Sequence, residues 1–171
     1  MEKIITDPSA EKLQLVIHQA IRAWDNQYKL VTTFFNQFDN AFYDQPVAPG
    51  RNRAIYLLGH LTGMNDLLLP ILGLGQQQFP ELEAMFVTSA DQPGAPIPSI
   101  IELREKWEKV NETLVKHFTQ MDVHDWFERH TRVSEADFEM DPNRNKLNVL
   151  LSRTNHMGYH YAQLVLLRPR A

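Results

Sequence analysis

Apolar residues recur every three or four positions along most of this chain, and that spacing is typical of one buried face of an α-helix. The first such stretch opens at Asp7-Pro8, where Asp is a favourable N-cap and proline suits the first helical position. The pattern predicts one long amphipathic helix that runs to about Phe38. Its apolar face is formed by Leu13, Ile17, Ala20, Ile21, Trp24, Tyr28, Val31 and Phe35.

A loop at residues 44–50 separates this helix from a second helical stretch. The second stretch begins at about Asn52 or Arg53, continues to about Leu72 and is apolar nearly all round. We therefore expect it at the centre of the fold or at an oligomer interface. Pro70 should kink or end this helix, and the two glycines that follow it should stop it.

The next connection is long and rich in Gln, Pro and Gly, and it runs through Pro98 with a short helix expected around residues 81–86. A connection of this length indicates that the chain crosses the fold instead of making a tight hairpin. Ser99 and Glu102 then have the spacing of a capping box, which predicts the start of a third helix. Its apolar positions are Ile100, Leu103, Trp107, Val110, Leu114 and Phe118.

The segment at residues 123–144 is less regular. Trp126 and Phe127 predict a short helix there, and a few later apolar residues predict a brief extended piece or a loop. Those later residues are Val133, Phe138 and Met140. A last helix is expected from about Asn145 to Leu167.

Four long helical patterns and almost no alternating strand pattern predict an all-α fold. With a long connection after the second helix, the expected architecture is a four-helix bundle with a crossover between helices 2 and 3. The chain has 171 residues and 43% hydrophobic content, which suits one domain spanning residues 1–171 with a single core.

Composition restricts the chemistry open to such a protein. The chain has no cysteine, which excludes disulfide frameworks, thiolate zinc sites, iron–sulfur clusters and cysteine nucleophiles. The net charge is −4 and the basic residues are spread out, so no nucleic-acid partner is expected. No P-loop, dinucleotide fingerprint or serine-hydrolase motif is present.

The most apolar region, residues 54–74, is interrupted by His60, Asn65, Asp66 and Pro70, so no membrane span is expected. The first residues contain no apolar stretch of signal-peptide length. We therefore expect a soluble, cytoplasmic protein.

Two histidines four residues apart, His156 and His160, lie within the predicted last helix. At this spacing both imidazoles project from the same side of the helix, one turn apart, and can reach one ion. They lie on the shoulder of the apolar arc, flanked by Val149, Arg153 and Leu167. A helix in a bundle contacts two neighbours, so we expect both rings to point into the protein.

A tight site normally takes three protein ligands, and His60 is the best third candidate. It lies in the most apolar helix, where an imidazole without a partner loses its contacts with water at a cost of about 1–3 kcal/mol. Coordination would satisfy one ring nitrogen, and an acceptor such as a backbone carbonyl would hold the other. Asp66 and Glu128 are carboxylates that could also bind an ion, although nothing in their spacing favours them.

Each of these histidines also has a purely structural interpretation. A histidine pair on one helix is commonly solvated, and a single histidine in an apolar helix is commonly hydrogen-bonded to a neighbour in the core. Residue chemistry alone leaves the structural role and the metal site about equally favoured. The remaining histidines stand among polar neighbours and are expected at the surface; they are His18, His117, His124 and His130.

The last helix reads Asn-His-Met-Gly-Tyr-His-Tyr-Ala-Gln-Leu from Asn155 to Leu164. Together with a histidine in an apolar second helix and a long crossover, this sequence resembles the DinB/YfiT-like superfamily over nearly the whole chain. The usual closing pattern of that family is His, three residues, His, then a small residue, Gln and Leu. Many members have Arg-Gly where this chain has Tyr161-Ala162, which calls into question any substrate contact made by the usual arginine.

The resemblance implies a four-helix bundle that holds one divalent metal ion, either nickel, zinc or iron, on three histidines. In this chain they are His60, His156 and His160. It also implies a homodimer and, where an activity is assigned, a metal-dependent hydrolase or a transferase that uses a low-molecular-weight thiol. Gln163 and Tyr159 are candidates for orienting the ligands or a small-molecule substrate.

Three hypotheses follow from these observations. The first is a metal-dependent enzyme in which a water or a thiol bound to the ion becomes acidic. Because the chain has no cysteine, any thiol nucleophile must arrive as a cosubstrate. The second is a non-catalytic stress or detoxification protein that binds a metal or a small ligand. The third is a helical protein whose histidines are structural and whose apolar second helix is a dimer face.

Overall fold

The structure is a computed structural model that describes residues 8–169, so the predicted N-cap Asp7 lies outside the described residues. Within that range the chain is all-α, with six α-helices, four 3₁₀- or π-helical turns and no β-strand. The helices are α1 (Pro8–Phe35), α2 (Ala54–Asp66), α3 (Leu68–Leu72), α4 (Ile100–Gln120), α5 (Glu135–Met140) and α6 (Lys146–Leu164). The turns are η1 (Asn40–Asp44), η2 (Glu83–Val87), η3 (Asp125–Phe127) and η4 (Val165–Leu167).

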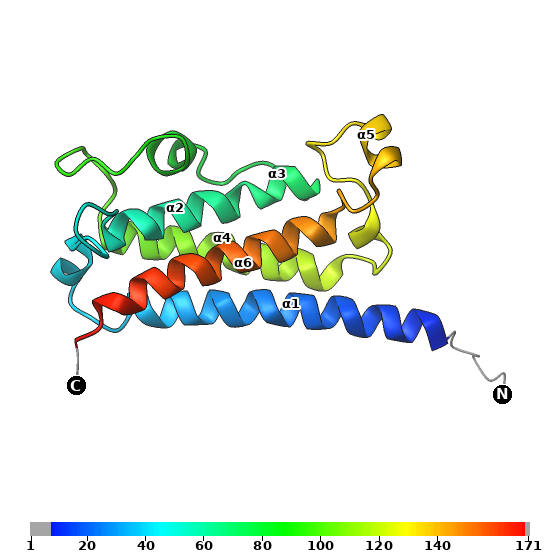
Figure 1. The fold of residues 1–171 in the computed structure, drawn as a ribbon, viewed down its shortest axis with the longest axis horizontal. Coiled ribbons are helices and arrows are strands. Elements are labelled where there is room, and N and C mark those ends of the chain that lie inside the picture. The colour runs from blue at the N-terminus through cyan, green and yellow to red at the C-terminus, as the bar shows by residue number, and fades with distance from the viewer. Residues whose placement is uncertain (1–7, 170–171) are drawn as a thin grey trace.

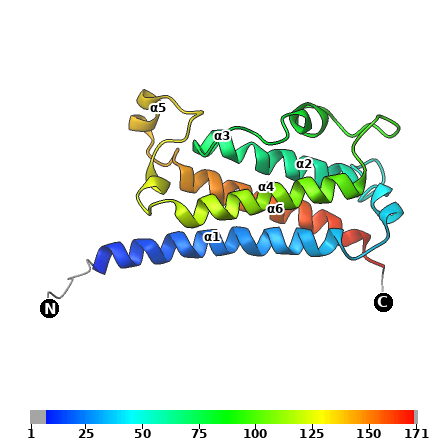
Figure 2. The same cartoon turned by 180° about the vertical axis from the view of Figure 1, so that it is seen from behind.

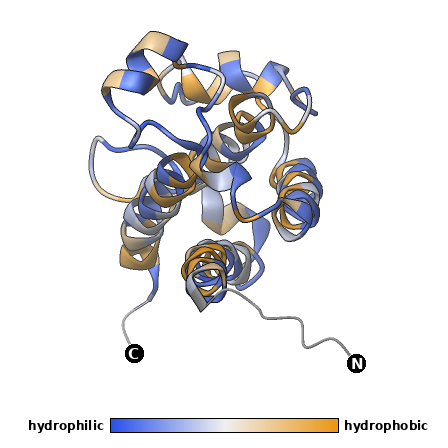
Figure 3. Ribbon diagram, turned by 90° about the vertical axis from the view of Figure 1, so that its right-hand side faces the viewer, coloured by the Kyte–Doolittle hydropathy of each residue, from blue (hydrophilic) through white to orange (hydrophobic). Residues whose placement is uncertain are grey.

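The four longest helices, α1, α2, α4 and α6, lie alongside one another (Figure 1). α1 packs against α6 and α4, and α2 packs against the same two helices. Views from opposite sides show this arrangement (Figures 1 and 2). Seen end-on, the ribbons of these helices carry both hydrophobic and hydrophilic residues, as amphipathic helices should (Figure 3). The apolar faces meet in one core.

All three tryptophans lie in the core. Trp24 and Trp126 are fully buried, and Trp107 is 2% exposed. Edge-on ring contacts join Trp24 to Phe118 and Phe118 to Trp126, with centroids 5.1 and 5.3 Å apart. These contacts tie α1 and α4 to the turn η3, and aromatic pairs of this kind add about 0.5–1.5 kcal/mol beyond the area they bury.

α2 is buried on nearly all sides, which fits the central position that its uniformly apolar sequence predicts. By length and composition the segment Ala54–Leu72 is apolar enough to cross a membrane, but 83% of its most apolar window is buried inside the protein. Such burial is typical of the core helix of a soluble protein.

α1 ends at Phe35, three residues before the expected limit at Phe38. The Tyr43 hydroxyl explains this difference, because it donates to the Phe34 carbonyl at 2.9 Å and accepts from the Phe38 amide at 3.0 Å. Both groups would have needed helical partners if α1 had continued. η1 therefore caps the end of α1 through one buried side chain.

Pro70 interrupts the second predicted helix as expected, and the interruption lies at Leu67, before the proline. A proline inside a continuous helix would clash with the carbonyl four residues earlier, so the chain restarts as α3 and places Pro70 in its first turn. Gly73 then ends α3 with a φ of 74°, a left-handed conformation that glycine adopts without strain.

The connection between α3 and α4, residues 73–99, is the crossover segment. It returns along α2, so that α4 begins near the start of α2 and runs in the same direction (Figures 1 and 2). The short helix expected at residues 81–86 is present as the π-helical turn η2. The capping box of α4 is also confirmed, since Ser99 and Glu102 exchange both hydrogen bonds.

One local prediction is wrong. The residues around Phe138 and Met140, expected as an extended piece or a loop, form the short helix α5. The Ser134 side chain accepts a hydrogen bond from the Asp137 amide and caps this helix. A serine followed three residues later by an acidic residue is a start signal for a helix, and it outweighs the spacing of two apolar side chains.

Candidate metal centre

One imidazole from α2 and two from α6 converge inside the protein. His156 Nε2 lies 3.1 Å from His60 Nε2 and 3.1 Å from His160 Nε2. One ring nitrogen from each histidine lies within 4.8 Å of the other two. The three residues expected to form a site from the sequence are therefore together in space, and we name them the histidine triad.

The secondary structure explains this convergence. His156 and His160 are one turn apart on α6, and their ring centroids are 4.6 Å apart. His60 reaches them from α2, although 96 positions of sequence separate it from His156. Its ring centroid lies 5.0 Å from each of the other two. All three residues are partly or largely buried, and His160 is 9% exposed.

The outward nitrogens of two triad rings have acceptors. His60 Nδ1 lies 2.7 Å from the Phe86 carbonyl oxygen, and His160 Nδ1 lies 2.9 Å from Gln163 Oε1. Because a carbonyl can only accept, each of these Nδ1 atoms carries a hydrogen and each Nε2 keeps a free lone pair. His156 differs, since its Nδ1 is buried without a hydrogen-bond partner.

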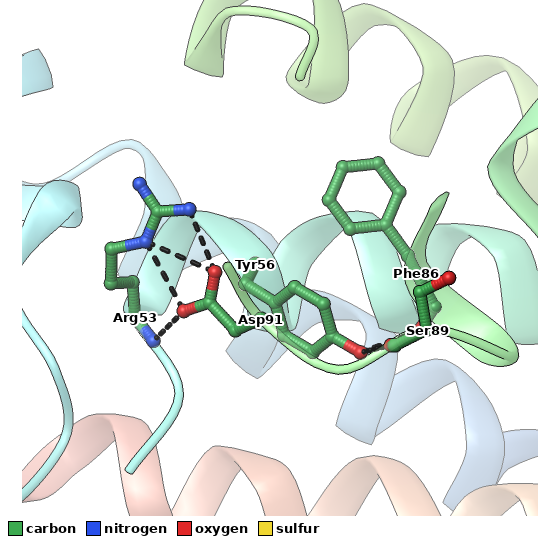
Figure 4. Close-up of polar contacts among 5 residues, drawn as sticks. All are labelled: Arg53, Tyr56, Phe86, Ser89 and Asp91. Carbon is green, nitrogen blue, oxygen red and sulfur yellow. Dashed lines mark hydrogen bonds and ion pairs between the residues drawn. The ribbon is translucent and has the colours of Figure 1, made fainter. Parts of the chain in front are cut away.

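The Phe86 carbonyl is held in place by contacts between α2 and the crossover segment (Figure 4). Arg53 forms a two-pronged ion pair with Asp91, with Nη2 2.7 Å from Oδ1, and its backbone amide donates to Oδ2 at 2.8 Å. One turn further along α2, the Tyr56 hydroxyl approaches the carbonyls of Phe86 and Ser89 at 3.1 and 2.5 Å. His60 follows after one more turn, so these α2 side chains form a row that fastens the segment.

Gly59 lets the turn η2 approach α2 closely. A Cβ built on Gly59 would lie 2.5 Å from Phe86 Cε1, which is shorter than any normal carbon–carbon contact. The Phe86 ring is fully buried and so cannot swing into solvent. The missing side chain at Gly59 is therefore what allows Phe86 to pack against α2 with its carbonyl within reach of His60.

The surroundings of the triad favour neutral imidazoles. Burial lowers the pKa of His156 to about 3, and the neighbouring charges of His160, Arg153 and His60 add to the decrease. Burial also lowers the pKa of His60 and of His160, although their hydrogen bonds to Phe86 and Gln163 oppose the shift. All three rings are unprotonated at neutral pH, which is the state in which histidine binds a metal.

The donor set fits a divalent transition metal. Nitrogen ligands bound to one zinc ion at about 2.0–2.1 Å lie roughly 3.3 Å apart in a tetrahedral site. The separations of 3.1 Å on either side of His156 are close to that spacing. Imidazole suits zinc, nickel, iron and copper, so the ligand type alone does not select one ion.

The other residues considered from the sequence lie elsewhere. Asp66 is fully buried, but its carboxylate accepts hydrogen bonds from the Gln78 and Phe79 amides, where it anchors the start of the crossover segment. Glu128 forms an ion pair with Lys146. The four remaining histidines are exposed or half-exposed and do not join the triad: His18, His117, His124 and His130.

Gln163 Oε1 lies 2.9 Å from His160 Nδ1 and can hold that ring, whereas Tyr159 is 63% exposed and contacts His160 through an edge-on ring pair. Two features could not be assigned from the sequence. One is the Phe86 carbonyl, because nothing in the crossover segment indicates which residue of it meets α2. The other is Arg153. Its spacing from His156 places it beside the triad, but the sequence does not show that its guanidinium lacks a hydrogen-bond or ion-pair partner.

Comparison with models of known protein families finds none that matches this chain, and no curated protein matches its sequence. The function is therefore inferred from the site itself.

Proposed function

We propose that this protein binds one divalent metal ion, nickel, zinc or iron, through His60, His156 and His160. We further propose that it is a DinB/YfiT-like four-helix bundle that uses the ion for hydrolysis or for the transfer of a low-molecular-weight thiol. The observation that carries the proposal is the meeting of three Nε2 atoms, 3.1 Å apart on either side of His156.

Proton positions argue against a purely structural role for these three rings. A hydrogen-bonded cluster needs a donor in each close pair of nitrogens. The Nδ1 hydrogens of His60 and His160 are donated to carbonyl oxygens, so neither ring has a hydrogen on Nε2. Only His156 can then supply a hydrogen, and one Nε2–H serves one of its two 3.1 Å neighbours at a time. A cation satisfies all three lone pairs at once, which is the arrangement that a metal site requires.

The chemistry proposed for the site follows from its ligands. A divalent ion on His60, His156 and His160 would have three neutral ligands, and it would supply Lewis acidity that lowers the pKa of a water or a thiol. The protein's own contribution is to hold the rings. The Phe86 carbonyl orients His60, and Gln163 orients His160 through its side-chain oxygen.

Elemental analysis of protein purified without a histidine tag tests the metal site. We expect about one metal ion per chain in the wild type and a loss of that ion in His156→Ala. The matched control is His124→Ala, which removes an exposed histidine outside the triad and should leave the metal content unchanged. Metal that is substoichiometric and does not fall in His156→Ala would refute the proposal.

Catalysis needs a second experiment. The metal-loaded and metal-stripped proteins should be assayed with a low-molecular-weight thiol and an electrophile, and with hydrolysable esters and amides. Turnover only by the loaded form supports an enzyme. Stoichiometric metal with no turnover of any of these substrates would favour the non-catalytic binding protein.

A further inference from the structure

Arg153 lies on the same face of α6 as the triad. It precedes His156 by three residues and His160 by seven, so it stands about one turn and two turns below those rings. Its charge is felt at the site, because it contributes to the lowered pKa of both His60 and His156, after the larger effect of burial. Arg153 therefore borders the triad from the side of α6 that leads toward α5.

This arginine has no partner among the described residues. No hydrogen bond or ion pair joins it to any side chain or carbonyl within residues 8–169, and its Nε is buried without an acceptor. Its terminal nitrogens also lack acceptors but, unlike Nε, keep some exposure to solvent. A largely buried guanidinium without an anion is costly, and such groups are retained where something else neutralises them.

The neighbouring charges do not neutralise it. Burial lowers the pKa of Arg153 to about 10, and the nearby charge that adds to this shift is another arginine, Arg132. His130 is in similar surroundings, since burial and then Arg144, Arg132 and Arg129 lower its pKa. Arg153 remains cationic at neutral pH and adjoins a region of positive charge.

We infer that Arg153 and the histidine triad form a two-point site for a small substrate that carries a carboxylate or phosphate group. The planar guanidinium binds the anionic group through paired N–H donors, and the other end of the substrate reaches the ion held by the triad. Arg153 is thus a binding and specificity residue. This inference rests on the proposed metal site, and it adds the class of substrate that the site selects.

The test uses protein loaded with Co²⁺, whose absorption spectrum reports binding of a thiol to the ion. Two probes of equal length are titrated, 3-mercaptopropionate, which ends in a carboxylate, and 3-mercapto-1-propanol, which ends in a neutral hydroxyl. We expect the wild type to bind the carboxylate probe about tenfold more tightly, as a charge-assisted hydrogen bond provides. Arg153→Gln should bring the two affinities together, and Arg153→Lys should keep part of the difference.

The matched control is Arg22→Gln, which removes the same charge from an exposed position on α1 and should leave the ratio of affinities unchanged. Thermal unfolding gives a second readout. A structural arginine would lose stability on replacement, whereas an unpaired buried cation kept for binding should leave Arg153→Gln as stable as the wild type or more so.

Equal affinities of the wild type for the two thiols, or a preference that survives in Arg153→Gln, would overturn the two-point site while leaving the metal proposal intact. Failure of the wild type to hold Co²⁺ would instead reject the metal site. In that case inorganic phosphate decides the role of Arg153, because it should raise the Tm of the wild type and not that of Arg153→Gln. No such difference would reject anion binding by Arg153.

Discussion

His60 Nδ1 lies 2.7 Å from the carbonyl oxygen of Phe86, so the imidazole on α2 is oriented by the crossover segment and not by its own helix. The same segment is fastened to α2 through Arg53 and Tyr56. The contacts of Arg53 and Tyr56 with the segment therefore help to determine the direction of the Nε2 lone pair of His60. Mutations in the segment should change metal affinity without touching a ligand.

Gly59→Ala should separate the segment from α2. The added methyl group would meet the buried Phe86 ring at 2.5 Å, so we expect the protein to lose about 1–3 kcal/mol of stability through overpacking and to bind metal more weakly. Gly63→Ala is the matched control, because its nearest contact is a milder 3.2 Å to Val87 Cγ2. Urea unfolding and metal titration of both variants check this, and equal effects at the two glycines would contradict it.

Asp91→Asn should weaken the same attachment by a different route. Its side chain is 6% exposed and Arg53 is 15% exposed, so removing the carboxylate leaves a poorly solvated guanidinium at a cost of roughly 2–3 kcal/mol. Asp25→Asn breaks the exposed pair with Lys29 and should cost less than about 1 kcal/mol. Chemical unfolding of the two variants compares them directly. A loss at Asp91 no larger than that at Asp25 would show that the segment is held by other contacts.

Gln163→Leu should reduce metal affinity about 10- to 100-fold, since replacing a group that orients a histidine ligand has effects of that size. The leucine fills similar space but leaves His160 Nδ1 without its acceptor at 2.9 Å. Gln163→Glu keeps an acceptor oxygen and should retain most of the affinity. Competition with a chromophoric chelator measures both dissociation constants. Wild-type metal affinity in Gln163→Leu would mean that helix packing alone determines the orientation of the His160 ring.

The metal-free protein should become less stable as the pH falls below the ordinary histidine range. Burial holds the pKa of His156 at about 3 in the folded state, whereas in the unfolded chain the pKa of the same group is near its ordinary value of 6.5. Between these values the unfolded chain binds more protons, so the free energy of unfolding decreases as the pH is lowered from about 6.5 toward 3. Above that window His156 is neutral in both states and contributes no pH dependence.

Unfolding experiments at several pH values on metal-free wild type and His156→Gln measure this contribution. Glutamine does not titrate, so the acid-induced loss of stability should be smaller in the variant. Identical slopes in the two proteins would show that His156 is not shielded from protonation in the folded state.

Much of this arrangement follows from local sequence signals. Helical periodicity places His156 and His160 on one side of α6, and the Ser99–Glu102 capping box marks the start of α4 because both hydrogen bonds are local. The approach of His60 is a long-range event that the sequence supports only through the apolar character of α2. The expectation that a backbone carbonyl would hold its second nitrogen is confirmed, and the carbonyl belongs to Phe86.

Other features needed the three-dimensional structure. The partner of His60 comes from a segment without regular periodicity, where no pattern indicates which residue faces α2. A charged residue on a helix shoulder is ordinarily solvated or paired, so no sequence pattern predicts that Arg153 is largely buried and unpaired. The prediction did not include α5 because the spacing of Val133, Phe138 and Met140 is not helical, whereas the start of the helix is marked only by the capping residue Ser134.

The distance along the chain between the triad's members has a consequence for biosynthesis. His60 precedes His156 by 96 positions, and His160 follows four residues later. A nascent polypeptide emerging from the ribosome exposes α2 long before α6 exists, and for that interval a lone imidazole is available. An ion can therefore be held by all three rings only after translation has passed His160 and folding has brought α2 and α6 together.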